Sequence, residues 1–514
     1  MIATNIRRLA VYLVLAFTAV SAGLAWWQVI DAPQLAARQD NPQVIASRRS
    51  AQRGAIFDTN GQLLASSQVI DGISRRTYVD PAFSHVIGYA SLRFGTTGVE
   101  RAWDDLLTGR ADPNPFRDLV NDILGRQQPP SDLTLTIDRR LQDFAAGQLG
   151  TDVGAVVAID PRTGAILAMT STPTYDPTPI SGDPATAVEP MQQISSQPNN
   201  PLVARDRQGR YTPGSILKVL TAAAGLDSGA ITPQTTFPDQ PREETEGFVV
   251  EGFRVLEHDL SPVTPALWPL SPALQVSSNI YFAHVGLELG ADRFLDYARR
   301  FGFCEPLVIG SDDRGLAVLP SYLTAQVAAD CAPFADRAEV AQAAFGQGRV
   351  DVTPVQMALL AATIANNGVM PAPYVVRDLR AHAPDPAAGP SDRVVASYGG
   401  QGGGRAIGSQ AAAQVRSAMV DAVQGELGRL YAGTGAMTLY GVSGVATAGK
   451  TGTAERGPDL PPHSWFIGFA PAQDGATPAI AVAVLVEGGG SGSGRAAPIG
   501  GAVMAEWLKI LAAS

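Results

Sequence analysis

Lysine is scarce in this sequence. The 514 residues include 38 lysines and arginines together, but only Lys218, Lys450 and Lys509 are lysine. Arginine stays protonated in proteins, whereas a buried lysine can lose its proton and serve as a base. Lys218 and Lys450 both stand in short motifs that contain hydroxyl residues. We therefore expect these two positions to need an amine that can deprotonate, while Lys509 is an ordinary surface charge.

Cysteine and histidine are also rare. The two cysteines, Cys304 and Cys331, could pair in an oxidising compartment or stay buried as small apolar residues, and the sequence leaves this open. The five histidines show none of the spacings that metal ligands have, so we predict neither a metal nor a cofactor.

Positive charge is in deficit over the whole chain. The net charge of −10 disfavours a nucleic-acid partner, which would favour a basic face. The hydrophobic share of 45% and the charged share of 17% are ordinary for a folded protein. Because 514 residues exceed what one core usually holds, we expect two or more domains.

Charge is missing altogether from a stretch near the N-terminus. Arg7 and Arg8 precede an uncharged apolar run from Leu9 to Ile30, which is long enough to span a bilayer. Basic residues before such a run favour a cytoplasmic N-terminus. We predict a cytoplasmic stub and a single transmembrane anchor over 1–30, rather than a cleaved signal peptide with its shorter apolar core. Everything after the anchor would be extracytoplasmic.

Residues 31–130 are predicted to form a small α+β pedestal domain that begins with a stalk over 31–52. Asn60-Gly61 lies between two apolar segments, which is a strong hairpin signal. An amphipathic segment then ends near Leu107. From the residues alone we interpret this part as a binding or spacer domain.

Residues 131–514 are predicted to form a second, larger α+β domain. Its clearest elements are helices over 139–149, 354–366 and 496–513, a hairpin over 154–169, and strands over 465–470 and 480–486. The Pro/Gly/Ser-rich stretch 383–409 is predicted to be a surface loop.

A serine and a lysine stand one helical turn apart in the middle of this domain. Pro213-Gly214 indicates a turn, and the apolar run after it indicates a buried helix with Ser215 at its N-terminus. Residues at i and i+3 share a helix face, so Lys218 can act as a base toward the Ser215 hydroxyl. The alternative is that Lys218 is only a long side chain reaching out of a core helix.

Two further motifs follow along the chain. Ser277-Ser278-Asn279 lies between apolar helices and, taken alone, could be only a helix cap. Lys450-Thr451-Gly452-Thr453 precedes the two predicted strands near the C-terminus.

Together, Ser215-Ile-Leu-Lys218, Ser277-Ser-Asn279 and Lys450-Thr-Gly452 resemble, in order, the three motifs of the penicillin-binding protein and serine β-lactamase superfamily. The anchor and further segments narrow the resemblance to class B, monofunctional penicillin-binding proteins. It is most similar to the short actinobacterial penicillin-binding protein A type, over essentially the whole chain. The segments are Arg53 to Gly61, Gly98 to Glu100, Phe345 to Gly348, and His463 to Pro471.

The resemblance implies a transpeptidase domain with a mainly antiparallel five-stranded sheet flanked by helices. It implies a peptidoglycan D,D-transpeptidase that cross-links stem peptides ending in D-Ala-D-Ala. Ser215 would attack the penultimate D-Ala carbonyl, and Lys218 would take its proton. Ser277 and Lys450 would relay a proton to the leaving D-Ala, while Asn279 positions Lys218 and the substrate amide.

The resemblance also assigns the third motif and the partners. Lys450, Thr451 and Thr453 would bind the substrate carboxylate, Gly452 would allow its close approach, and the backbone N–H groups of Ser215 and Thr453 would form the oxyanion hole. β-Lactam antibiotics would acylate Ser215. A SEDS-type membrane glycosyltransferase would supply the glycan strand.

Other functions remain as alternatives. A D,D-carboxypeptidase or a β-lactamase would hydrolyse the acyl-enzyme with the same residues, although neither needs the anchor and the pedestal. A β-lactam or muropeptide sensor should carry a larger signalling part. A pure scaffold would not need all three motifs.

Overall fold

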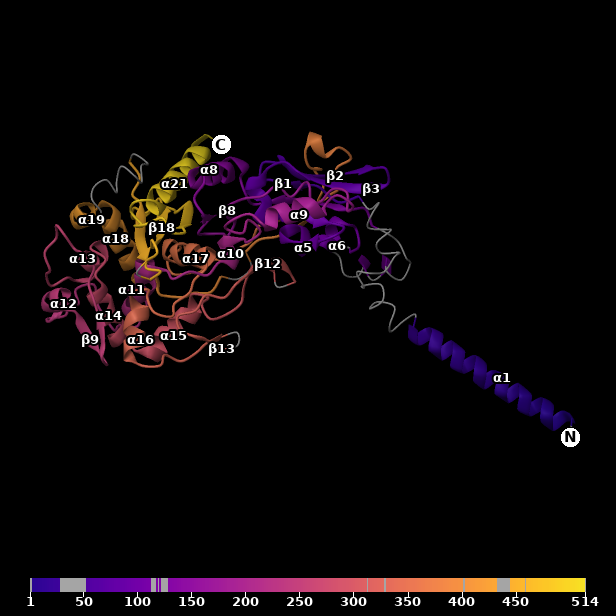
Figure 1. The fold of residues 1–514 in the computed structure, drawn as a ribbon, viewed down its shortest axis with the longest axis horizontal. Helices are drawn as coiled ribbons and strands as arrows, with labels where there is room; N and C mark the ends of the chain where they lie inside the picture. The colour runs from indigo at the N-terminus through magenta and orange to yellow at the C-terminus, as the bar shows by residue number, and fades with distance from the viewer. Residues whose placement is uncertain are drawn as a thin grey trace.

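The computed structural model describes residues 2–27, 52–111, 117–118, 120–121, 128–311, 313–327, 330–400, 403–431, 444–457 and 459–513. The N-terminal helix α1 (Ile2–Ala25) lies at one end, away from the rest of the molecule (Figure 1). Its apolar side chains are exposed, with Phe17 at 79%. A helix that is apolar all round and covered by no protein suits a bilayer. The expected stalk over 31–52 lies, except for residue 52, outside the described residues.

The pedestal is built on a six-stranded sheet of order β16-β15-β6-β1-β2-β3. Its strands are β1 (Ile56–Phe57), β2 (Leu63–Ile70), β3 (Ile73–Tyr78), β6 (Ser131–Leu135), β15 (Val376–Ala381) and β16 (Val394–Ser397). The hairpin predicted at Asn60-Gly61 is confirmed, because β1 and β2 pair antiparallel on either side of it. The prediction of a surface loop over 383–409 is wrong for 394–397, which pair with β15 as an edge strand. The chain therefore returns to the pedestal sheet after residue 370.

The pedestal also contains several short helices and one small hairpin. They are η2 (Pro81–Phe83), α4 (Ser84–Ile87), β4 (Ala90–Ser91), β5 (Gly95–Thr96), α5 (Gly98–Ala102), α6 (Asp104–Leu107) and η4 (Pro386–Ala388). Around Glu100 of α5, the pedestal buries a cluster of oppositely charged side chains. Glu100 is fully buried and forms ion pairs with Arg53 at 2.8 Å and Arg76 at 2.6 Å, and Arg53 also pairs with Asp104.

The second domain is organised around a five-stranded antiparallel sheet of order β17-β18-β19-β7-β8, as predicted. Its strands are β7 (Gly154–Ile159), β8 (Ile166–Thr172), β17 (Ala448–Ala454), β18 (His463–Ala470) and β19 (Ile480–Val486). Successive side chains of a strand point to opposite faces. In β19, Val482 and Val484 accordingly join one apolar core, whereas Ala481 and Ala483 join the other.

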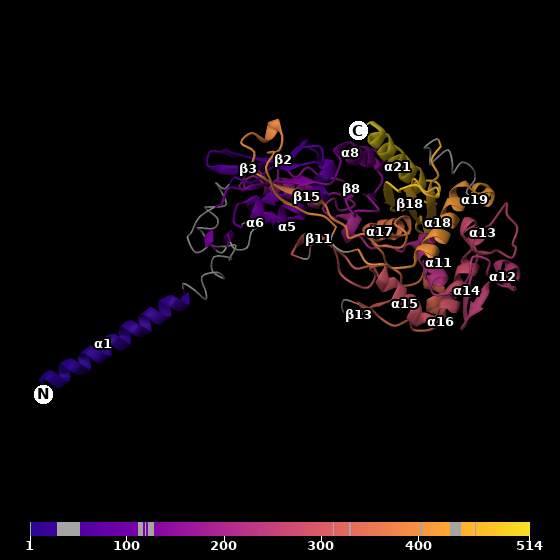
Figure 2. The same cartoon turned by 180° about the vertical axis from the view of Figure 1, so that it is seen from behind.

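Helices cover both faces of this sheet. The helices α8 (Arg139–Leu149) and α21 (Ala496–Ala513) pack side by side on one face (Figure 2). On the other face lie α17 (Pro354–Ala365) and α18 (Ser409–Gln424), and α11 (Lys218–Asp227) packs against α18. The predicted α+β architecture of a helix-flanked antiparallel sheet is therefore confirmed. Because α21 packs on β18 and β19, its apolar residues belong to a protein core.

A mainly helical region adjoins β17 and completes the domain. It contains α12 (Gln240–Glu246), β9 (Phe248–Val250), β10 (Phe253–Val255), α13 (Leu270–Gln275), α14 (Asn279–Leu289), α15 (Ala291–Arg300), α16 (Arg337–Ala344) and α19 (Glu426–Tyr431). The connecting segments carry α9 (Val188–Ser195), α10 (Arg205–Gln208), η3 (Gly214–Leu217), β11 (Leu307–Ser311), β12 (Arg314–Val318), β13 (Gln326–Val327) and β14 (Asp330–Cys331).

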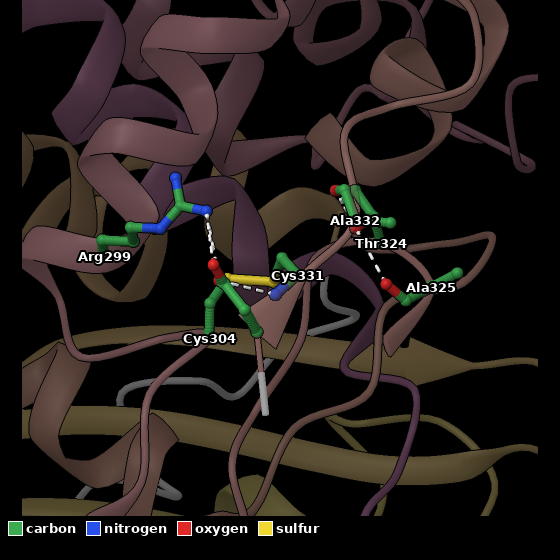
Figure 3. The surroundings of a disulfide bond; sticks show 7 residues. Arg299, Cys304, Thr324, Ala325, Cys331 and Ala332 are labelled. Atoms are coloured by element: carbon green, nitrogen blue, oxygen red, sulfur yellow. Dashed lines mark hydrogen bonds and ion pairs between the residues drawn. A yellow bond between two sulfur atoms is a disulfide. The ribbon is translucent and has the colours of Figure 1, made fainter. Parts of the chain in front are cut away.

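Cys304 and Cys331 form a disulfide, which settles the question that the sequence left open (Figure 3). The bond joins the segment after α15 to the short β13–β14 hairpin across a sequence separation of 27. Arg299, near the end of α15, bonds to Asp330 beside it.

Candidate active site

The three sequence motifs meet where the helical region faces the edge of the five-stranded sheet. The first lies in η3 and the start of α11, the second in the turn before α14, and the third in the edge strand β17. Ser215 does not lie in the first turn of the α-helix but in the tighter 3₁₀ turn η3, with α11 beginning at Lys218.

Lys218 is the centre of the hydrogen bonds in this site. Its side chain is fully buried, and its Nζ lies 3.0 Å from Ser215 Oγ, 2.8 Å from Asn279 Oδ1 and 3.3 Å from Ser277 Oγ. It also donates to the carbonyl oxygen of Ser277. Burial lowers the pKa of Lys218 to about 7, although the Glu257 carboxylate acts in the opposite direction.

The acceptors around Lys218 leave one position of its nitrogen for Ser215. The Ser277 carbonyl and the Asn279 amide oxygen can only accept, so they take two N–H groups of Lys218. The remaining position on the nitrogen faces Ser215 Oγ. In the neutral amine a lone pair is aimed at the Ser215 hydroxyl, which can donate its proton to it.

Ser277 connects the two buried lysines. Its Oγ lies 2.8 Å from Lys450 Nζ and 3.3 Å from Lys218 Nζ. Its backbone has a φ of 60°, in the left-handed region that side chains rarely adopt. Burial, followed by the charge of Lys218, holds the pKa of Lys450 well below its usual value. A proton can therefore pass along a chain of hydrogen bonds from one lysine through Ser277 to the other.

The turn that carries Ser215 packs closely against β17. A Cβ atom added to Gly214 would lie 2.8 Å from the carbonyl oxygen of Thr453, and one added to Gly452 would lie 2.8 Å from that of Pro213. In an antiparallel strand the N–H and C=O of one residue point to the same side. The Thr453 N–H therefore faces the turn of Ser215, whose own N–H is among the unpaired groups at a helix start.

The threonines of β17 line the open part of the site. Thr451 is half-buried and Thr453 is exposed, and Thr453 Oγ1 accepts a hydrogen bond of 3.2 Å from the Gly492 N–H. With Lys450 on the same strand, this edge offers hydroxyl and ammonium groups to a carboxylate. Among the described residues, no group of three or more His, Cys, Asp or Glu is arranged to hold a metal ion.

The segment before the serine is held by bonds to neighbouring strands. Trp465 in β18 donates from Nε1 to the Thr212 carbonyl at 3.0 Å. Glu487, just after β19, accepts from the Tyr211 hydroxyl at 2.8 Å and from Arg205 Nε at 2.7 Å. These contacts fix the chain that leads into η3, so that Ser215 is presented by a rigid scaffold.

One buried residue of the site was missed by the sequence analysis. Glu257 contacts the second motif and interacts with Lys218. No motif contains it, and it is 20 residues from Ser277 in sequence. Only the folded structure brings this carboxylate to the site. By contrast, Ser215, Lys218, Ser277, Asn279 and Lys450, which the sequence had singled out, are all joined by direct hydrogen bonds.

Comparison with known families gives two matches. Residues 154–505 match the penicillin-binding protein transpeptidase domain. Residues 53–133 match the penicillin-binding protein A dimerisation domain. Because the first match covers more than half of the chain, this chain belongs to the penicillin-binding protein family.

Similar proteins have been named or solved in mycobacteria. The chain is 36% identical to the peptidoglycan D,D-transpeptidase PbpA of Mycolicibacterium smegmatis, over 98% of this chain and 99% of the relative. It is 34% identical to the protein of the same name from Mycobacterium tuberculosis, over 97% and 98%. The structure resembles the imipenem acyl-enzyme complex of penicillin-binding protein A from M. tuberculosis. That match has a TM-score of 0.74, 34% identity, and coverage of 90% of this chain and 100% of the other.

Proposed function

We propose that this chain is a peptidoglycan D,D-transpeptidase that works through an acyl-enzyme on Ser215 and is covalently inhibited by β-lactams. The observation that carries the proposal is the continuous set of hydrogen bonds from Ser215 through Lys218 and Ser277 to Lys450. A nucleophile within reach of a base, with that base oriented by further groups, is the arrangement that activates a serine. Relatives named as peptidoglycan D,D-transpeptidases support the choice of substrate.

In the first half-reaction, Ser215 Oγ attacks the carbonyl carbon of the penultimate D-Ala of a stem peptide. Neutral Lys218 takes the hydroxyl proton as the new C–O bond forms. The oxyanion is held by the N–H groups of Ser215 and Thr453, a contribution of about 2.7–4 kcal/mol for one such donor. As the C–N bond breaks, the proton passes through Ser277, with Lys450 beside it, to the nitrogen of the leaving D-Ala.

In the second half-reaction, an amine of a neighbouring stem peptide attacks the acyl carbon. Its proton returns through Lys218 to Ser215 Oγ as the ester C–O bond breaks, and the new amide cross-links two strands. Throughout the cycle, Asn279 orients Lys218, Gly452 leaves room on β17, and Lys450, Thr451 and Thr453 bind the terminal carboxylate of the donor peptide. No cofactor takes part in these steps.

We extend the proposal to the position of the chain at the membrane. The protein is membrane-anchored through α1, as a single-pass protein with its catalytic domain outside the cytoplasm. Arg7 and Arg8, which lie near the start of α1 and before its uncharged stretch, support this orientation. The Cys304–Cys331 disulfide is a second support, since disulfides are rare in the cytoplasm.

The domain organisation is proposed as an anchor over 1–30, a pedestal over 31–130 and a transpeptidase domain over 131–514. The two family matches, to 53–133 and 154–505, support this division. Three strands of the pedestal sheet, β6, β15 and β16, are contributed by the segment 131–514. The proposed partner is a SEDS-type membrane glycosyltransferase, contacted by the pedestal. The support for it is the place of the pedestal between anchor and catalytic domain in the sequence.

Intact-mass spectrometry of the full-length protein in detergent tests the acylation. We expect one benzylpenicillin adduct per chain, retained for minutes and absent from Ser215→Ala. Ser228→Ala, which changes a serine at the other end of α11, serves as the matched control and should keep the adduct. An adduct lost within seconds would identify a β-lactamase, and no adduct on folded protein would favour a scaffold.

A second assay separates transpeptidation from hydrolysis. The same protein receives a donor peptide ending in D-Ala-D-Ala together with an acceptor amine. We expect the amide product in excess over the free acid. Release of free acid alone would identify a D,D-carboxypeptidase, and acylation without either product would favour a β-lactam or muropeptide sensor.

A further inference from the structure

The segment Leu256–His258, which follows strand β10, runs alongside the turn of the second motif. The Leu256 carbonyl accepts a hydrogen bond of 3.1 Å from Asn279 Nδ2. His258 Nε2 lies 3.2 Å from the carbonyl oxygen of Val276. Because Asn279 Nδ2 is fixed in this way, Asn279 Oδ1 is directed at Lys218. The segment thus contacts the chain on both sides of Ser277.

Between these two contacts, Glu257 holds the turn directly. Its side chain is only 2% exposed. Its carboxylate accepts from Ser278 Oγ at 2.7 Å, from the Asn279 N–H at 2.8 Å and from the Ile280 N–H at 3.2 Å. Charge-assisted hydrogen bonds of this kind are the strong ones, and an anion is favoured at a helix N-terminus. Glu257 therefore fixes the first two residues of α14.

We call the hydrogen bonds from Leu256–His258 to this turn the clamp. Ser277, immediately before the residues that Glu257 holds, has a strained backbone. Ser277 has a φ of 60°, and such a conformation persists only where its surroundings enforce it. Leu256 and His258 hold the chain on either side, and Glu257 holds Ser278 and Asn279. Release of the clamp would let Ser277 relax and would carry its Oγ away from the two lysines.

Glu257 also faces the charged groups of the site. Lys218 and Lys450 are both buried, at 0% and 4% exposure, and Lys218 acts on Lys450 as a like charge. The carboxylate that interacts with Lys218 is Glu257. Its other neighbours are His258, whose Nδ1 lies 2.9 Å away, and Glu244, which shares the Ser278 hydroxyl at 3.3 Å.

The pKa values of the two neighbouring carboxyl groups are shifted in opposite directions. Burial would raise the pKa of Glu257, but the bonds and charges of His258, the charge of Lys218 and the Asn279 N–H outweigh it and hold that pKa low. Burial raises the pKa of Glu244, although Gln240 and Ser278 donate to it. Of the two carboxyl groups, Glu257 is the one whose surroundings favour the charged form.

We infer that Glu257 is a positioning residue, whose carboxylate holds the Ser277–Asn279 turn in its catalytic geometry and supplies the negative charge that acts on Lys218. This inference rests on the proposed function, since it assigns a second set of contacts to the same acylating site. Two effects are separable. The hydrogen bonds keep Ser277 Oγ between the lysines, and the charge determines the pH at which Lys218 becomes a base.

Glu257→Gln in the full-length protein tests both effects through the acylation rate constant with a fluorescent penicillin, measured from pH 5 to 9. Glutamine removes the charge and leaves one acceptor atom for three donors. We expect the rate constant at pH 8 to fall at least about tenfold. Without the carboxylate, Lys218 deprotonates more readily, so the acid limb of the profile should move to lower pH by on the order of one unit. Glu246→Gln removes an exposed carboxylate of α12 and should leave both unchanged.

Glu257→Asp separates position from charge, and near-UV circular dichroism checks the folding of every variant. Aspartate keeps the charge but withdraws it by one methylene, so we expect a lower rate constant and an acid limb at the wild-type pH. A wild-type rate constant in Glu257→Asp overturns the positioning role, even if Glu257→Gln does not fold. If Glu257→Gln folds but the acid limb of its pH profile stays at the wild-type pH, the electrostatic role of Glu257 is overturned. If the wild-type protein itself forms no adduct, the proposed function fails, and the inference fails with it.

Discussion

Two groups of buried charged side chains in this molecule have opposite compositions of charge. In the pedestal, Glu100 is enclosed by Arg53 and Arg76, and each guanidinium finds a carboxylate. In the catalytic site, Lys218 and Lys450 are buried close enough to act on each other as like charges. The first cluster joins opposite charges, whereas the second gathers like charges.

The difference appears in the protonation of the two clusters. In the pedestal, burial would raise the pKa of Glu100, but Arg76 and Arg53 hold it below its usual value, so the cluster stays fully charged. In the site, burial lowers the pKa of Lys218 to about 7, and the Glu257 carboxylate opposes this only in part. Paired buried charges hold a structure together, whereas a buried charge with too little compensation becomes an acid or a base.

The largest effect is expected from Lys218→Arg. Arginine keeps the positive charge but cannot deprotonate near neutral pH, so it cannot take the Ser215 proton. We expect the rate constant for acylation by benzylpenicillin to fall by about 10²–10⁴, the usual contribution of a general base. Lys509→Arg, which changes a lysine 72% exposed on α21, is the matched control and should acylate like the wild type. If benzylpenicillin acylated the Lys218→Arg protein at the wild-type rate, Lys218 would not be the base, and the two clusters would no longer differ in this respect.

The pedestal should respond in the opposite way to the loss of its central charge. Glu100→Gln leaves Arg53 and Arg76 buried with too little negative charge, which we expect to lower the free energy of unfolding by about 3–5 kcal/mol. Urea denaturation measures this loss, with Glu246→Gln as the exposed control. The molecules that remain folded should be acylated by benzylpenicillin with the rate constant of the wild type. If Glu100→Gln kept the free energy of unfolding of the wild type but showed a large change in the acylation rate constant, the pedestal cluster would also take part in catalysis.

A smaller and graded effect is expected from pH. Lys218 acts as a base only when neutral, and its pKa is about 7. The acylation rate constant should therefore rise with pH up to about 7 and fall by about tenfold for each unit well below it. Stopped-flow measurement with a chromogenic cephalosporin gives this profile. A rate constant that kept rising toward the ordinary lysine pKa of 10.5 would contradict the neutral base.

Part of the candidate site could be predicted because some of its signals are local. Ser215 and Lys218 are three residues apart, and helix geometry alone brings them to one face. Lys450 stood out because the chain has so few lysines. That Ser277 lies between the two lysines could not be derived from spacing, since 173 residues separate it from Lys450. Only the resemblance to a known family linked those motifs before the structure did.

The parts that escaped prediction depend on long-range contacts. Glu257 lies outside every motif, and its importance arises only when its segment packs beside Ser277–Asn279. The edge strand β16 was hidden because its surroundings are rich in proline and glycine, which indicate a loop. It becomes a strand by pairing with β15, as part of a sheet that begins more than 300 residues earlier.

The proposed mechanism depends on Lys218 being neutral near pH 7. Its protonation state can be measured directly by NMR, because the chain has so few lysines. Full-length protein in detergent, labelled with ¹³C at the lysine side chain, should give three sets of lysine signals. Lys450→Arg and Lys509→Arg assign them by the signal that each removes. We expect the Lys218 ε-carbon to titrate with a midpoint near pH 7. A midpoint near 10.5, the ordinary value for lysine, would contradict it.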